Sequence, residues 1–126
     1  MTSRTKSILL VDDNANVRKA LRDLFENARF TCIEAEDGAQ ALELAERLQP
    51  DLIVLDFSMP QMNGLEAAPL LKKKLPDTPI IMFTMFATEA FAKMAIAAGI
   101  TEVIPKDKAA SDLLPRVGSI LHFPTE

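Results

Sequence analysis

The chain has 126 residues and a net charge of −4, with 48% hydrophobic and 25% charged residues. This length and composition predict a single domain spanning residues 1–126 and exclude an intrinsically disordered protein. The mild acidity excludes unspecific nucleic-acid binding, and one cysteine with one histidine excludes an internal disulfide and an intrachain zinc site. No apolar run reaches the roughly 18 residues of a membrane span, and the N-terminal segment lacks a signal-peptide core. We therefore expect a cytoplasmic protein whose partners are neither membranes nor nucleic acids.

Short apolar segments alternate with segments of helical periodicity along the whole chain. Strands are predicted over residues 7–11, 30–35, 52–55, 80–84 and 102–105. The first, third and fourth lack polar alternation, as strands buried on both faces do. Helices are predicted around residues 17–28, 41–48, 64–75, 89–98 and 110–123. Because strand and helix alternate five times, the order predicts an α/β fold with a parallel sheet covered by helices on both faces.

Four residues predict where these helices begin, end or bend. Asp37 followed by Gln40 predicts a capping box at the start of the second helix, and Gly99 predicts the end of the fourth. Pro69 and Pro115 fall inside the third and fifth helical segments, where a proline removes a backbone hydrogen bond and clashes with the preceding turn. We therefore expect those two helices to begin late or to be kinked.

Polar residues follow four of the five predicted strands. Asp12 and Asp13 follow the first strand, Asp56 follows the third, Thr84 closes the fourth and Lys106 follows the fifth. The carboxyl ends of parallel strands meet at one edge of the sheet, where ligands bind, so we expect these side chains to lie close together. Clustered carboxylates with no cysteine or histidine nearby suit a hard cation such as Mg²⁺ or Mn²⁺. A carboxylate in such a site can attack phosphorus, while the cation, the lysine and the hydroxyl stabilise the transferring phosphoryl group.

Each of these residues alone also has an ordinary explanation. Asp13 or Asn14 could cap the first helix, and Asp56 could be a turn residue. Thr84 could simply end a strand, and Lys106 could be a solvated surface charge. The joint placement of the side chains, rather than any one of them, indicates a functional site.

Five segments together carry a resemblance to a known family. They are ILLVDDN, DLIVLDFSMPQMNGLE, PIIMFT, AAGI and VIPKD, in this order. The set closely resembles the receiver domain of two-component response regulators, over residues 7–121. The stretches IIMFTM and MAIAAGITEVIPKD look most like receivers of the NarL/FixJ type. The resemblance implies a flavodoxin-like (βα)5 fold, a doubly wound parallel sheet with strand order 2-1-3-4-5, which the chemotaxis receivers also show.

The resemblance also implies a phosphoacceptor and a set of metal ligands. Asp56 would accept a phosphoryl group from a histidine kinase, a phosphotransfer protein or a small phosphodonor. Asp12, Asp13 and the backbone carbonyl of Ser58 would bind Mg²⁺ together with Asp56. Only self-phosphorylation and self-dephosphorylation are implied, so the protein would be a signalling receiver and not an enzyme with an external substrate.

Two further residues would contact the phosphoryl group. Thr84 would hydrogen-bond it once it is attached to Asp56. Lys106 would pair with Asp56 first and then with a phosphoryl oxygen. The switched form would also pair with a second copy of the chain, as a homodimer, through the fourth helix, fifth strand and fifth helix.

The sequence departs from the family pattern near the lysine. Family members usually carry Tyr or Phe three residues before it, and that ring turns inward on activation; here the position is Val103. Phe86 could substitute for the ring, although a packed or half-exposed core position explains it better. Pro105 directly precedes Lys106, which fixes the backbone angle of Pro105 while leaving the reach of the lysine intact.

Three other functions remain open at this point. A flavin or dinucleotide binder needs a phosphate-binding loop after the first strand, where DDNANV places two negative charges. A metal-dependent phosphatase with an aspartyl nucleophile usually has a second acid two residues later, where Ser58 stands. A receiver-like interaction module with weak or absent switching fits Val103, although all the polar site residues are present. The chain ends at Glu126 without a DNA-binding helix-turn-helix, so we expect a stand-alone or an excised receiver that does not itself bind nucleic acid.

Overall fold

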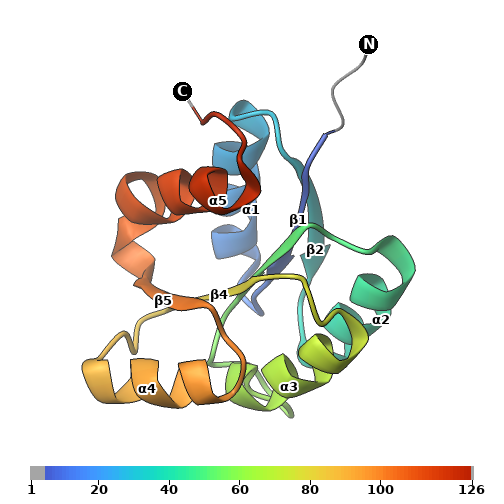
Figure 1. Cartoon of the computed structure of the whole chain (residues 1–126), viewed down its shortest axis with the longest axis vertical. Coiled ribbons are helices and arrows are strands. Elements are labelled where there is room, and N and C mark those ends of the chain that lie inside the picture. Colours follow the sequence, from blue (N-terminus) through green and yellow to red (C-terminus); the bar gives the residue numbers. More distant parts are fainter. Residues whose placement is uncertain (1–4, 126) are drawn as a thin grey trace.

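A parallel sheet forms the centre of the chain in this computed structural model, which describes residues 5–125. Its five strands are β1 (Ser7–Val11), β2 (Thr31–Ala35), β3 (Leu52–Leu55), β4 (Ile80–Thr84) and β5 (Glu102–Pro105). The helices are α1 (Ala15–Asn27), α2 (Gly38–Leu48), α3 (Gly64–Lys74), α4 (Glu89–Ala97) and α5 (Leu114–Leu121). The strand order is β2-β1-β3-β4-β5 (Figure 1). This is the predicted flavodoxin-like arrangement, and the predicted fold class and strand order are confirmed.

The sheet has a hydrophobic core on each face. Successive strand residues point to opposite faces, so Leu10 packs with Phe25 under α1 and α5, while Leu9 packs with Leu71 under α2, α3 and α4 (Figure 1). The middle strands β1, β3 and β4 are covered on both sides, which explains why their sequences are apolar with no alternation. Within residues 5–125, each helix is too short or too polar to cross a lipid bilayer.

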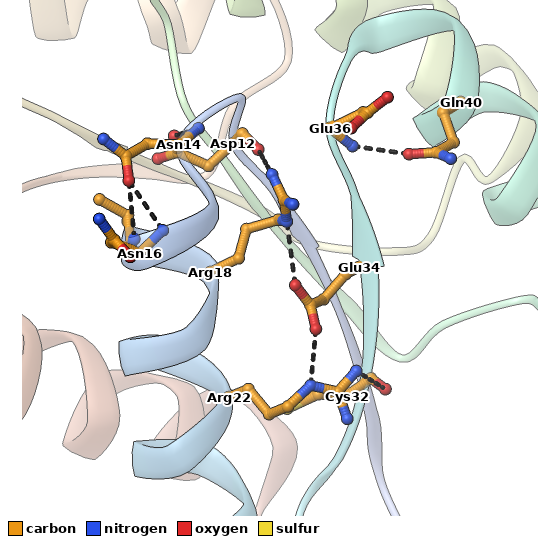
Figure 2. A network of polar contacts seen from close by, with 10 residues as sticks. Asp12, Asn14, Asn16, Arg18, Arg22, Cys32, Glu34, Glu36 and Gln40 are labelled. Atoms are coloured by element: carbon orange, nitrogen blue, oxygen red, sulfur yellow. Dashed lines mark hydrogen bonds and ion pairs between the residues drawn. The ribbon is translucent and has the colours of Figure 1, made fainter.

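The ends of α2 and α4 follow the sequence signals closely. The Asp37 carboxylate accepts a hydrogen bond from the backbone N–H of Gln40 at 2.8 Å, as the capping box requires. The Gln40 amide oxygen, however, accepts from the N–H of Glu36 at 2.7 Å, one residue earlier than predicted (Figure 2). Gly99 follows α4 with φ +97°, a conformation that favours glycine, so the predicted helix end is confirmed.

Pro115 shifts the start of the fifth helix. The chain passes from β5 through a 3₁₀ turn (Lys106–Lys108) and a π-helical turn (Ala109–Leu113) before α5 begins one residue ahead of the proline. Pro115 thus lies in the first turn, where its missing N–H would have had no partner within the helix. The late start predicted for this helix is confirmed.

Pro69 does not delay the third helix, contrary to one of the two expectations. The helix begins at Gly64 and continues past Pro69 to its end. A complete capping box explains the early start, because the Asn63 side chain accepts from the Glu66 N–H and the Glu66 carboxylate accepts from the Asn63 N–H, both at 2.9 Å. This cap satisfies the helix start well upstream of the proline.

Candidate functional site

The ends of β1 and β3 place two buried carboxylates side by side. One residue beyond each strand the parallel ladder continues, since the Asp12 N–H donates to the Ala35 carbonyl at 3.1 Å and the Asp56 N–H to the Val11 carbonyl at 2.9 Å. Asp12 is 3% exposed and Asp56 4% exposed. The backbone therefore fixes both side chains at the carboxyl edge of the sheet before any ligand is present.

A third carboxylate joins them from the loop between β1 and α1. Asp12, Asp13 and Asp56 each place one carboxylate oxygen within 4.8 Å of the others, and Asp13 is the exposed member of the group. The three acids predicted to meet at the strand ends are thus brought together. Two sit inside the protein and one faces solvent, so the cluster is accessible from outside.

Asn14 caps α1, which decides between the two caps considered from the sequence. Its side-chain oxygen accepts from the backbone N–H groups of Asn16 at 2.9 Å and Val17 at 3.1 Å. Its own N–H donates to Oδ1 of Asp12 at 2.9 Å. Because Asn14 performs the capping, the Asp13 carboxylate can belong to the acidic cluster.

Lys106 lies between the two buried carboxylates. Its Nζ is 2.8 Å from Oδ2 of Asp12 and 3.4 Å from Oδ2 of Asp56. The family resemblance implied pairing with Asp56, whereas the shorter contact here is with Asp12. One ammonium thus contacts two neighbouring acids and can balance the charge of only one of them.

Comparison with known proteins shows which family contains this chain. Residues 8–118 match the family model described as the response regulator receiver domain. The chain belongs to this family. It is 37% identical over 123 residues to a putative transcriptional regulator of Pseudomonas aeruginosa, and 38% identical over 110 residues to the nitrate/nitrite response regulator protein NarL of Escherichia coli. The match with NarL agrees with the predicted similarity to NarL/FixJ-type receivers.

Solved structures also resemble this chain. The curated relatives match it over only part of their own length. The response regulator domain of Thermotoga maritima CheB superimposes with a TM-score of 0.85 at 30% identity, covering 96% of this chain and 99% of that one. The two curated matches cover 94% and 86% of this chain but only 59% and 51% of the relatives. The chain therefore spans little more than half of these relatives, in the part that forms the receiver.

The receiver site consists of Asp12, Asp13, Asp56 and Lys106, and its donor atoms fit a hard divalent cation. The cluster consists of three carboxylates, and neither histidine nor cysteine belongs to it. Oxygen ligands of this kind suit Mg²⁺ or Mn²⁺, and Mg²⁺ typically binds through one or two carboxylates while keeping water and phosphate ligands. Asp12, Asp13 and Asp56 could hold such an ion, and Ser58, which is exposed two residues after Asp56, could add its carbonyl.

Burial and crowding of charge raise the pKa of Asp56 to about 6. Burial has the largest effect and the neighbouring Asp12 charge adds to it, while the Lys106 ammonium and the backbone of Ser58 oppose the rise. For Lys106, burial disfavours the charged form, but the hydrogen bond to Asp12 and the charges of both acids raise its pKa above the ordinary value. The site thus holds more negative charge than its lysine can balance, which favours binding of a cation.

Gly64 allows α3 to begin directly behind the receiver site. Its N–H donates to the Phe57 carbonyl at 2.8 Å. A β-carbon at this position would overlap the carbonyl oxygen of Asp56 and lie 2.6 Å from the Met82 methyl group. No local sequence pattern predicts this role, although the glycine stands in the segment DLIVLDFSMPQMNGLE, which carries the family resemblance.

Three phenylalanines connect the residue after Asp56 to α4. The ring of Phe57 meets those of Phe86 and Phe91 edge to face, with centroid distances of 5.7 Å and 5.1 Å. Phe86 is half exposed, as expected, and its N–H donates to the hydroxyl of the buried Thr84 at 3.2 Å. Only Phe86 was noticed in the sequence, because ring contacts between separate segments leave no local pattern.

The raised pKa of Asp56 predicts how stability depends on pH without divalent cations. The folded state binds the proton more tightly than the unfolded chain, whose reference pKa is 3.8. The stabilising contribution of this carboxyl is therefore complete below pH 3.8 and is lost as the pH rises through about 6. By about pH 7 the loss amounts to at most about 3 kcal/mol, so Asp56→Asn should gain in stability relative to wild type between about pH 4 and about pH 7.

Urea unfolding of both proteins across this pH range measures the difference. Asp23→Asn, which removes an exposed carboxyl on α1, serves as the control and should show little change of this kind. A stability difference between Asp56→Asn and wild type that stays constant with pH would contradict the raised pKa of Asp56.

Proposed function

We propose that this receiver accepts a phosphoryl group on Asp56 in a Mg²⁺-dependent reaction and passes the change to the loop after β4 and to α4. The observation that carries the proposal is the buried Asp56 carboxylate at the end of a central strand, within reach of two further acids and one ammonium. The family membership supports it, because receivers of two-component systems are signalling domains. We propose the chain as one such domain, acting in the cytoplasm.

The contacts favour Asp56 over Asp12 as the phosphoacceptor. Both oxygens of Asp12 have close partners, Oδ1 the Asn14 N–H at 2.9 Å and Oδ2 the Lys106 ammonium at 2.8 Å. The contact of Asp56 with Lys106 is longer, 3.4 Å. Asp56 can therefore attack phosphorus without giving up a short contact with Lys106, while Asp12 and Asp13 would hold the cation.

The proposed reaction transfers one phosphoryl group to Asp56. A carboxylate oxygen of Asp56 forms a bond to phosphorus as the bond from phosphorus to the donor's nitrogen or oxygen breaks, leaving an acyl phosphate. Asp12, Asp13 and the Ser58 carbonyl would hold Mg²⁺, which supplies neutralisation of charge on the transferring oxygens. Lys106 would turn from Asp12 to a phosphoryl oxygen. The donor would be a phosphohistidine of a kinase or phosphotransfer protein.

Thr84 links the phosphoryl group to the neighbouring loop. Its hydroxyl now accepts from the Phe86 N–H at 3.2 Å. Turning the hydroxyl to donate to a phosphoryl oxygen would weaken that contact and release the loop that carries Phe86. Val103 is too small and too stiff about χ1 to follow by a large rotation, as an aromatic ring could. We therefore propose that the phenylalanines described above transmit the change to α4 instead.

The α4 helix is suited to move because it is weakly anchored. Of its residues only Ala95 is buried, whereas Met94 is 57% and Ile96 60% exposed. A helix with few buried contacts shifts at low cost. We propose that the face formed by α4, β5 and α5 contacts the next protein or a second copy in the phosphorylated state. If the chain only bound partners without switching, as Val103 alone would suggest, α4 would stay unchanged.

The phosphoacceptor assignment predicts the outcome of chemical phosphorylation. Incubation with Mg²⁺ and acetyl phosphate or phosphoramidate should add one phosphoryl group to the wild type, seen as an increase in intact mass. Asp56→Asn should gain none, since its amide is not a nucleophile of comparable strength. Asp51→Asn, at the opposite end of β3, is the control and should be modified like wild type. Equal phosphorylation of Asp56→Asn and wild type would disprove the assignment.

The proposed route to α4 predicts which amides respond to activation. Beryllofluoride with Mg²⁺ should change the amide exchange of residues 85–98 while leaving Val103 little affected. Phe91→Ala should keep the response near Thr84 but lose most of the response in α4, because the ring contact with Phe57 is gone. Met94→Ala removes an exposed side chain of the same helix and should respond like wild type. Changes confined to Asp12, Asp13 and Asp56 in wild type would favour the module without switching.

A further inference from the structure

A network of ion pairs joins β2 to α1 beside the receiver site (Figure 2). The Glu34 carboxylate of β2 accepts from Nε of Arg18 at 2.9 Å and from Nε of Arg22 at 2.7 Å. Arg22 also pairs with Glu26 one turn further along α1 at 2.8 Å. Burial disfavours the ionised form of Glu34, but the two arginines outweigh it and hold the pKa of Glu34 below its usual value.

One arginine of this network reaches the acidic cluster. Nη1 of Arg18 donates to the backbone carbonyl of Asp12 at 2.6 Å, and the Arg18 side chain is only 14% exposed. Figure 2 shows its guanidinium between Asp12 and Glu34, with Arg22 on the far side of Glu34. The contacted carbonyl belongs to the peptide that joins Asp12 to Asp13.

Both backbone polar groups of Asp12 have hydrogen-bond partners. The N–H of Asp12 is held by the Ala35 carbonyl at the end of the sheet, and Arg18 holds the carbonyl that follows. Rotation of the peptide would swing the exposed Asp13 carboxylate away from Asp12 and Asp56. A planar guanidinium can hold two acceptors in fixed directions at once, which a single ammonium cannot.

We propose that Arg18 is a positioning residue for the metal site: held by Glu34, it fixes the Asp12–Asp13 peptide so that the acidic cluster is ready to bind Mg²⁺. The proposal rests on the proposed function, in which that cluster binds the cation. Although β2 contributes no residue to the cluster, it would support the metal site through Glu34. Arg22 belongs to the same network, but among residues 5–125 its contacts are with Glu34, Glu26 and the Cys32 carbonyl, not with the cluster.

Charge and positioning predict opposite effects of removing Arg18. A positive charge next to the cluster repels Mg²⁺, so loss of the charge alone would strengthen binding of the cation. Loss of the positioning contact would weaken binding instead. Weaker Mg²⁺ affinity in a variant without Arg18 therefore reports geometry and not charge.

Calorimetric titration with Mg²⁺ tests the proposal without any phosphorylation step. Arg18→Met should weaken the Mg²⁺ affinity by about tenfold, the usual effect of removing a group that orients a metal ligand, while Arg22→Met should stay within about twofold of wild type. Both variants lose one arginine from Glu34, so a general loosening of β2 and α1 would affect them alike. Arg18→Lys, which keeps the charge, and Glu34→Gln, which loosens the anchor of Arg18, should each weaken binding severalfold.

Three results would overturn the proposal. Unchanged or tighter Mg²⁺ binding in Arg18→Met would show that the contact does not position the cluster. Equal weakening in Arg18→Met and Arg22→Met would show a general structural effect. Failure of the wild type to bind Mg²⁺ at millimolar concentration would overturn the proposed function together with this inference, whereas the first two results leave the proposed function intact.

Discussion

Repulsion between carboxylates that the backbone holds together is the constraint around which this receiver is organised. Asp12 and Asp56 are anchored by main-chain hydrogen bonds at the ends of adjacent strands, and both are almost fully buried. Their backbones cannot move apart without breaking hydrogen bonds that continue the sheet ladder. The structure relieves the repulsion in part by inserting Lys106, and the pKa of Asp56 still rises to about 6. The remaining excess of negative charge favours binding of a cation at this site.

In the proposed function, the same constraint lets one small site affect distant elements. Two polar groups at the sheet edge also contact a second segment: Asp12 contacts Arg18 and through it Glu34 of β2, and Thr84 contacts the loop after β4. The ring of Phe57, next to Asp56, touches α4. In the proposed mechanism, a change of charge at Asp56 would therefore alter the balance of contacts in several directions. The direction with the weakest anchoring, α4, is where we expect the largest displacement.

The sequence was informative wherever a backbone pattern decides the outcome. Apolar runs marked the strands, so the residues following them located Asp12, Asp13 and Asp56 at one edge, and the capping of α2 and the end of α4 were also readable. The late start expected for α3 from Pro69 did not occur, because the cap at Asn63 fixes the start of the helix at Gly64.

Contacts between long side chains could not be predicted from the sequence. The closer approach of Lys106 to Asp12 than to Asp56, and the reach of Arg18 to a backbone carbonyl, depend on where separate elements place flexible side chains.

The melting temperature as a function of Mg²⁺ concentration tests the central claim most directly. Millimolar Mg²⁺ should raise the melting temperature of wild type, because the cation binds only the folded cluster, and Asp13→Asn should lose most of this increase. A wild-type melting temperature indifferent to Mg²⁺ would contradict the account.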